Sequence, residues 1–417
     1  MRSIVWFLLV AVMAVVGATA LGANDGLVTI YWRGWRTDFS LNLFLLVLVG
    51  FFMAVYSLIR ALDSLLALPR RAKQWRITRR DRVAQAALRE GLAQYLAGRY
   101  TRAHKTCQKA IAIQADTPEL ALDAEFTALA HMLSAGSLHR LQDRARRDEH
   151  LQRALELSQL TRKPRATEEG ARLMAAESAL DDRDATRALR ELAALPPGVA
   201  RRTQALRLKL QAARLARQPM EALRTARLLA KHQGFTSTAA EGLLRTLAGE
   251  TLDGARDADQ MRSLWVNLDL HEKRDPLVVA DAARRMSRLG APHEARQWLA
   301  PLWDQINKQP PEAVTALSLA LRESLTELEA EWLPRLDTAT TAALRNPGLA
   351  LTLGLALAER QLWGKARGML LSAANDLQLD LTDRRAAWAQ LGQLAEREGR
   401  PDEAARFYRL AALPERD

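Results

Sequence analysis

The sequence is poor in cysteine, in aromatic residues and in residues that break helices. Its 417 residues contain one cysteine, Cys107, with 15 prolines, 21 glycines and 6% aromatic side chains. A single cysteine excludes an intramolecular disulfide and any C-x-x-C metal or redox site, and it is typical of a reducing compartment. Because alanine, leucine, arginine and glutamate dominate, the composition predicts an all-α protein.

The motifs that carry common chemistries are also missing. The sequence has no glycine-rich phosphate cradle, no H-E-x-x-H, no G-x-S-x-G and no C-x-x-C-H. We therefore expect no catalytic residue and no bound metal, and we predict that the protein is not an enzyme. The histidines show no metal-ligand spacing, so no cofactor is evident, although a histidine in contact with haem stays open as an alternative. They are His104, His131, His139, His150, His232, His271 and His293.

Two long stretches near the N-terminus carry no charge. They cover residues 3–24 and about 39–59, and they are apolar on every face. About 20 such residues cross the ~30 Å hydrocarbon core of a bilayer as a helix. The sequence thus predicts a two-helix transmembrane hairpin within residues 1–60, whose short connecting loop lies at the interface and contains Tyr31, Trp32 and Trp35. The alternative for the first stretch is a signal peptide cleaved after Ala20.

Positive charge is concentrated just after the second stretch. Residues 60–82 contain eight Lys/Arg and two Asp/Glu, whereas the loop has Arg33 and Arg36 balanced by Asp25 and Asp38. The positive-inside rule then predicts a multi-pass protein of a bacterial inner membrane whose C-terminal domain is cytoplasmic. We expect residues 61–82 to be a basic juxtamembrane segment in contact with the lipid bilayer and not with nucleic acid. Its membrane-flanking cations are Arg70, Arg71, Lys73, Arg76, Arg79 and Arg80.

A short pattern recurs in residues 83–417. A turn residue is followed five positions later by alanine, and apolar or small residues follow the alanine at four and seven positions. The alanines of the clearer copies are Ala103, Ala295, Ala366 and Ala404, and weaker copies place the alanine at Ala185 and Ala222. A period of about 36–41 residues is the mark of stacked helix pairs, in which the small alanine permits close approach of the two helices.

The last copy carries a more specific signature. Trp388, Leu391 and Gly392 form W-x2-L-G, and Ala404 and Tyr408 form A-x3-aromatic, which resembles a tetratricopeptide (TPR) repeat. Gly354 and Gly98 belong to corresponding places in other copies. The sequence thus predicts a TPR-like solenoid over residues 83–417, in which these residues pack helix against helix. The charge-dense run 142–149 interrupts the pattern and is expected to be an exposed helix.

The whole chain resembles the proteobacterial HemY family, the membrane TPR protein associated with haem biosynthesis and not the oxidase of the same name. The features that carry the resemblance are two N-terminal spans, a tryptophan-rich loop, the basic exit 69–75, and a first repeat containing Gly98 and Ala103. The resemblance implies a scaffold or regulator of late haem-pathway enzymes that acts through protein–protein interactions, with porphyrin hand-over between enzymes as a variant. A TPR adaptor for cell-envelope biogenesis and a protein that itself binds haem or porphyrin are the alternatives.

Overall fold

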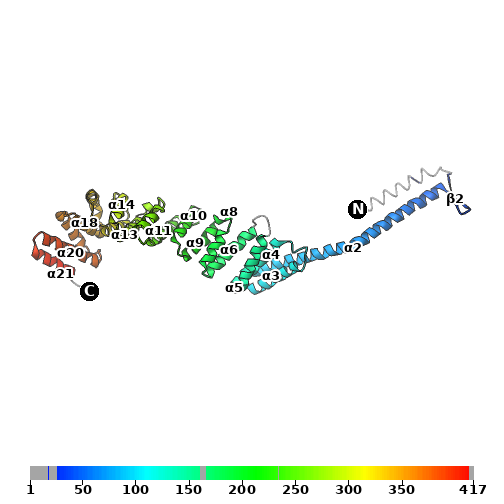
Figure 1. The fold of residues 1–417 in the computed structure, drawn as a ribbon, viewed down its shortest axis with the longest axis horizontal. Helices are drawn as coiled ribbons and strands as arrows, with labels where there is room; N and C mark the ends of the chain where they lie inside the picture. Colours follow the sequence, from blue (N-terminus) through cyan, green and yellow to red (C-terminus); the bar gives the residue numbers. More distant parts are fainter. Residues whose placement is uncertain (1–16, 18–25, 160–165, 233, 413–417) are drawn as a thin grey trace. The chain divides into compact units, whose positions relative to one another are not determined.

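The computed structural model describes Gly17 and residues 26–159, 166–232 and 234–412. The described chain is helical apart from one β-hairpin (Figure 1). It divides into two compact units, residues 1–143 and 144–417. The predicted span 3–24 lies outside the described residues except for Gly17, so the structure describes one of the two helices of the predicted hairpin.

A two-stranded antiparallel hairpin precedes the first long helix. Strand β1 is Leu27–Trp32, strand β2 is Trp35–Ser40, and Trp32 pairs with Trp35. Arg33 (φ 47°) and Gly34 (φ 87°) form the connection, and two residues of positive φ are the geometry of the tight turns that match strand twist. The segment that the sequence predicts to be an interfacial loop is therefore a β-hairpin.

Helix α2, Leu41–Leu96, is 56 residues long and begins directly where β2 ends. The Ser40 hydroxyl accepts a hydrogen bond from the Leu43 amide (3.3 Å) and so caps the helix. Residues Leu41–Leu62 of α2 are long enough and apolar enough to cross a membrane, which suggests membrane anchoring. The predicted boundaries at residues 60 and 82 fall inside this continuous helix.

The remaining elements of the first unit are α3 (Tyr100–Ala115) and α4 (Ala124–Arg140), and α3 packs against both α2 and α4. The second unit contains the other helices. They are α5 (Arg144–Gln159), α6 (Ala166–Asp181), α7 (Ala185–Ala193), α8 (Pro197–Ala200), α9 (Thr203–Leu215), α10 (Pro219–Lys231), α11 (Ser237–Asp253), α12 (Ala258–Val266), η1 (Glu272–Arg274), α13 (Pro276–Arg288), α14 (Pro292–Trp303), η2 (Ile306–Lys308), α15 (Pro311–Arg322), η3 (Ala330–Trp332), α16 (Leu333–Thr338), α17 (Thr340–Ala343), α18 (Pro347–Glu359), α19 (Trp363–Asn375), α20 (Leu381–Arg397) and α21 (Pro401–Ala412).

One backbone turn recurs along the chain. A residue of positive φ ends one helix, and the next helix begins two residues later. At the last copy, Gly399 (φ 74°) is followed by Arg400, whose amide donates to the Ala395 carbonyl at 2.8 Å. This is the Schellman arrangement, which satisfies the free carbonyls at a helix end. The same turn occurs at Gly98, Gln142, Arg183, Arg217, Gly290, Gln361 and Gly399.

Helices of the second unit pack in sequence order, each pair against the next pair along the chain (Figure 1). Helix α13 contacts α14 and α15, and α18 contacts α15, α19 and α20. The core is built of alanine and leucine with a few large side chains such as Trp303, which is fully buried. The fold is all-helical, as the composition predicts, and is consistent with a helical-repeat protein.

Two details of the predicted pattern differ from the structure. Ala185 is the first residue of α7 and is half-buried, whereas Ala188, five residues after the turn at Arg183, is fully buried. The run 142–149 contains Arg147, which is 1% exposed although an exposed helix was expected. Arg147 stands five residues after Gln142, at the place that alanine takes in the other copies.

Candidate functional site

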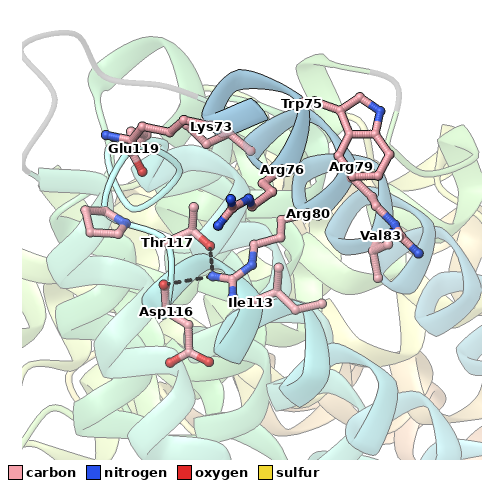
Figure 2. A pocket seen from close by; sticks show the side chains of 12 residues that line it. Lys73, Trp75, Arg76, Arg79, Arg80, Val83, Ile113, Asp116, Thr117 and Glu119 are labelled. Carbon is pink, nitrogen blue, oxygen red and sulfur yellow. Dashed lines mark hydrogen bonds and ion pairs between the residues drawn. The ribbon is translucent and has the colours of Figure 1, made fainter. Parts of the chain in front are cut away.

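A basic cleft lies beside α2, on the C-terminal side of the apolar span Leu41–Leu62. Its volume is about 590 Å³ (Figure 2). It lies between residues 73–83 of α2 and residues 113–119, which include the last turn of α3 and the turn after it. Consecutive turns of one helix bring the cations to one wall because residues three and four apart share a helix face. Four of the predicted membrane-flanking cations line the cleft: Lys73, Arg76, Arg79 and Arg80.

Two of these cations fasten α2 to the turn after α3. Arg80 Nη1 donates to the Asp116 carbonyl (3.1 Å) and to Thr117 Oγ1 (3.0 Å), and Thr117 is buried. Lys73 Nζ lies 2.8 Å from Glu119 Oε1. The hydrogen bond from Lys73 holds the pKa of the Glu119 carboxyl below its usual range. These contacts fix the direction of the Arg80 guanidinium at the cleft wall.

Arg76 is placed differently. It is exposed, its guanidinium points into the cleft beside Arg80 in Figure 2, and it makes no hydrogen bond or ion pair with any residue that the structure describes. Arg79 lies over the Trp75 ring, 5.4 Å from its centroid, and Trp75 is 63% exposed. Arg70 and Arg71 are exposed on the preceding turn of α2 and do not line the cleft.

This arrangement favours an anionic group. Arg76 and Arg80 meet an entering carboxylate or phosphate from the α2 side, and an arginine can bind such a group through two parallel hydrogen bonds. Val83 and Ile113 supply an apolar surface beside the charge. The cleft can therefore hold an acidic side chain or another anion at the start of the helical array.

The packing alanines of the four clearer copies are buried in the structure. Ala103, Ala295 and Ala366 are 0% exposed, and Ala404 is 2% exposed. Each stands five residues after a turn residue of positive φ, at Gly98, Gly290, Gln361 and Gly399 respectively. Their common position gives the second helix of each pair a small residue at its closest approach.

Two glycines mark close helix contacts in the last two pairs. A Cβ at Gly354 would lie 2.6 Å from Leu370 Cγ, and a Cβ at Gly392 would lie 2.7 Å from Tyr408 Cε1. Leu391 beside Gly392 is 1% exposed. A side chain at either glycine would require the side chain that faces it, Leu370 or Tyr408, to shift.

Trp388 packs against a residue that the sequence pattern did not single out. Its ring stacks on Phe407 with centroids 5.6 Å apart, and Phe407 is 7% exposed. Tyr408, the aromatic residue of the predicted motif, covers Gly392 instead and donates its hydroxyl to Glu396 (3.1 Å). Phe407 and Tyr408 are adjacent in the sequence, and the phase of α21 places Phe407 against Trp388 and Tyr408 against Gly392.

Arg147 is a second residue whose role the sequence did not reveal. Its guanidinium contacts Asp182 Oδ2 at 2.5 Å and Asp148 Oδ1 at 2.9 Å, and Asp148 also pairs with Arg187 at 2.7 Å. A buried cation is tolerated when its charge is paired and its donors are bonded. This group joins α5 to α7 and to Asp182, the first residue after α6.

Similar ion pairs join neighbouring helix pairs along the second unit. They connect residues 31 to 45 apart, about one repeat period. The pairs are Arg227–Glu272, Arg262–Glu294, Arg284–Glu323, Arg296–Glu329, Arg335–Asp304 and Arg367–Glu398. Arginine therefore supplies much of the polar contact between neighbouring helix pairs along the second unit.

The described residues hold no cluster of histidine, cysteine and carboxylate side chains that could bind a metal ion. Cys107 is buried beside Gly91, and burial raises the pKa of its thiol to about 12 in spite of a hydrogen bond with Ser134. The thiol is therefore protonated at neutral pH. Because the thiolate is the reactive form of cysteine, Cys107 is expected to be unreactive.

The fold and the basic cleft define an all-helical protein with an N-terminal helix that is able, by length and composition, to cross a membrane. A family model described as HemY protein N-terminus matches residues 26–132. The match covers the hairpin, α2, α3 and half of α4, including the basic cleft, and it supports a HemY-family protein. A search of the curated proteins found no match.

Proposed function

We propose that this protein is a membrane-anchored TPR scaffold or regulator that acts in the late steps of haem biosynthesis through protein–protein interactions, and that it catalyses no reaction itself. The observation that carries the proposal is the family match over residues 26–132. That segment joins the apolar span Leu41–Leu62 to the first helices of the array. A surface built in this way is held at the membrane, where it can gather partner enzymes.

The stacked helix pairs of the second unit support the proposal. Stacked helix pairs present an extended surface, and proteins of this class use such surfaces to bind partners. The basic cleft adds an anion-binding feature close to the span. In this proposal the array and the cleft lie in the cytoplasm of a bacterial cell, residues 1–60 cross the inner membrane twice, and late haem-pathway enzymes are the partners.

Co-purification tests the scaffold role directly. The full chain is extracted in a mild detergent, and proteins that co-elute are identified by mass spectrometry. We expect enzymes of the late haem pathway to be recovered, and a porphyrin carried with them would indicate hand-over. A matched control is a chain that contains residues 1–96 alone, which retains the membrane helix and lacks the array. Equal recovery with both chains, or recovery of cell-envelope enzymes instead, would refute the proposed role.

A second experiment separates regulation from catalysis. Deletion of the gene should lower cellular haem and raise a porphyrin precursor, while the purified protein should leave porphyrin substrates unchanged. Turnover by the purified protein would overturn the non-enzymatic part of the proposal without affecting the pathway assignment.

Reporter fusions test the proposed topology. A reporter that is active in the cytoplasm should work after residue 96 and after residue 417, and a reporter that is active in the periplasm should work when inserted at the hairpin turn Arg33–Gly34. Periplasmic activity at the C-terminus would reverse the orientation.

A further inference from the structure

The β1–β2 hairpin has two chemically different faces. Paired residues of an antiparallel hairpin share a face, and successive residues alternate between faces. The observed register therefore assigns Val28, Ile30, Trp32, Trp35, Thr37 and Phe39 to one face, and Leu27, Thr29, Tyr31, Arg36, Asp38 and Ser40 to the other. Apolar side chains dominate the first set, and polar side chains dominate the second.

The polar face satisfies its own charges. Asp38 Oδ1 accepts from Thr29 Oγ1 at 2.6 Å and from Arg36 Nε at 3.3 Å. The Arg36 guanidinium also lies 6.0 Å from the centre of the Tyr31 ring. This network is suited to water, since each of its members keeps a polar partner.

The apolar face is exposed in the part of the chain that the structure describes. Trp35 is 80% exposed, Trp32 is 72% exposed and Ile30 is 42% exposed. A two-stranded hairpin on its own is at best marginally stable in water, and it needs its apolar face covered by another surface. Exposure of adjacent tryptophans is the kind of apolar patch that marks an interaction site.

The position of the hairpin along the chain indicates what covers its apolar face. Ser40 is both the last residue of β2 and the cap of α2, and the apolar span begins at the next residue, Leu41. A helix that enters the hydrocarbon at Leu41 leaves the end of the hairpin at the boundary between acyl chains and headgroups. Tryptophan is enriched in this layer because its ring is apolar and its N–H can meet water or headgroups.

We propose that the hairpin lies on the lipid surface at the start of the α2 span, with the face of Trp32 and Trp35 in the lipid and the face of Thr29, Arg36 and Asp38 in water. The proposal rests on the membrane-anchoring part of the proposed function and not on the haem pathway. It separates Tyr31 from the two tryptophans, although the sequence groups the three aromatics together.

Two positions distinguish an effect of the hairpin face from an effect of the type of side chain. Tyr31 is aromatic but belongs to the polar face, and Thr37 is polar but belongs to the apolar face between Trp35 and Phe39. A side chain placed at 37 should therefore report lipid, and a side chain placed at 31 should report water. If membranes attracted aromatic side chains regardless of face, position 31 would report lipid and position 37 would report water.

Site-specific labelling in proteoliposomes tests the arrangement on the full chain. Cys107→Ala removes the native thiol, and single cysteines are introduced as Trp32→Cys, Trp35→Cys and Thr37→Cys on one face and Thr29→Cys, Tyr31→Cys and Arg36→Cys on the other. Each cysteine carries an environment-sensitive fluorophore. Nitroxide-bearing lipids and aqueous iodide are the two quenchers, and Val49→Cys within the α2 span reports whether the helix itself is inserted.

We expect nitroxide lipids to quench positions 32, 35 and 37 strongly and iodide to quench positions 29, 31 and 36 strongly, with a clear loss of fluorescence in each case. Equal quenching of both faces, or lipid quenching at 31 and not at 37, would overturn the proposal. Protection of the apolar face from both quenchers would also overturn it, because protein would then be the cover. If lipid quenches Val49 but not the hairpin, anchoring stands and the hairpin proposal fails.

Discussion

The ring of Tyr408 on α21 lies against the backbone of Gly392 on α20, so that a Cβ added at Gly392 would stand 2.7 Å from Tyr408 Cε1. The hydroxyl of Tyr408 is held by Glu396 one turn further along α20. In the same interface Trp388 stacks on Phe407, the residue next to Tyr408.

Gly392→Ala should therefore destabilise the C-terminal helix pair. Overpacking of this kind costs typically about 1–3 kcal/mol, which exceeds the gain in helix propensity of about 1 kcal/mol. The matched control is Gly368→Ala on α19, where a Cβ meets nothing within 4 Å and a small gain in stability is expected. Thermal and urea unfolding of both variants measure the difference, and equal stability would show that Tyr408 can be displaced at low cost.

The packing alanines give a second prediction. Ala404→Leu and Ala366→Leu should each lower the free energy of unfolding by about 1–3 kcal/mol, because these residues are 2% and 0% exposed at close helix contacts. Ala405→Leu places the same side chain on the exposed side of α21 and should be close to neutral. If Ala404→Leu melts like Ala405→Leu, the helix pair tolerates a wider separation than the structure has.

Glu329 links stability to pH. Burial acts to raise the pKa of Glu329, but hydrogen bonds from Arg296 and His293 outweigh it and lower that pKa to about 2, from an ordinary value of 4.5. The stabilisation is therefore complete above pH 4.5 and is lost as the pH falls towards 2. Because 28% of the Glu329 side chain is exposed, solvent screening reduces the effect to on the order of 1–2 kcal/mol.

We expect Glu329→Gln to be less stable than the parent at pH 7 and to approach the parent as the pH is lowered to 3. Urea unfolding at several pH values measures this convergence. A constant difference between the two proteins over this pH range would mean that the charge of Glu329 is not the stabilising feature.

The membrane-flanking cations fall into two groups with separable roles. Replacement of Arg70, Arg71, Arg76 and Arg79 by glutamine should weaken the uniformity of membrane topology, since flanking Lys/Arg set orientation. These four make no hydrogen bond or ion pair with the turn after α3 among the contacts that the structure records. Reporter fusions at the C-terminus measure the outcome, and unchanged topology would indicate that another segment sets orientation.

Lys73→Gln with Arg80→Gln is the complementary variant. It removes the exposed ion pair with Glu119 and the hydrogen bonds to Asp116 and Thr117, so it should lower the stability of the first unit while topology is kept. Protease resistance of residues 83–143 measures this effect. A change in topology without a change in stability would reverse the two assignments.

Removal of residues 347–417 tests the independence of the helix pairs. It deletes α18–α21 and so removes the contact that α18 makes with α15, a helix whose Leu317 and Leu321 are fully buried in the intact chain. Because each pair contacts mainly its neighbours, we expect the earlier helices to persist by circular dichroism and membrane localisation to be kept. Loss of partner capture would assign binding to the C-terminal pairs, and retention would assign it to earlier helices or to the membrane segment.

The sequence by itself determined the features that depend on local pattern. A span was predicted at 39–59 and the structure has an apolar stretch at Leu41–Leu62, because length and hydropathy are properties of neighbouring residues. The turns at Gly98, Gly290 and Gly399 were likewise readable, since glycine adopts positive φ at little cost. The family resemblance was confirmed over residues 26–132.

The tertiary structure decided what depends on partners far along the chain. The same turn occurs at Gln142, Arg183 and Arg217, where the hydrogen bonds of the helix end impose positive φ on ordinary residues. The hairpin faces became visible only through the register that pairs Tyr31 with Arg36 and Ile30 with Thr37. Arg147 is buried because Asp182, 35 residues later, meets its charge, and no local pattern records a counter-charge that folding brings from another helix.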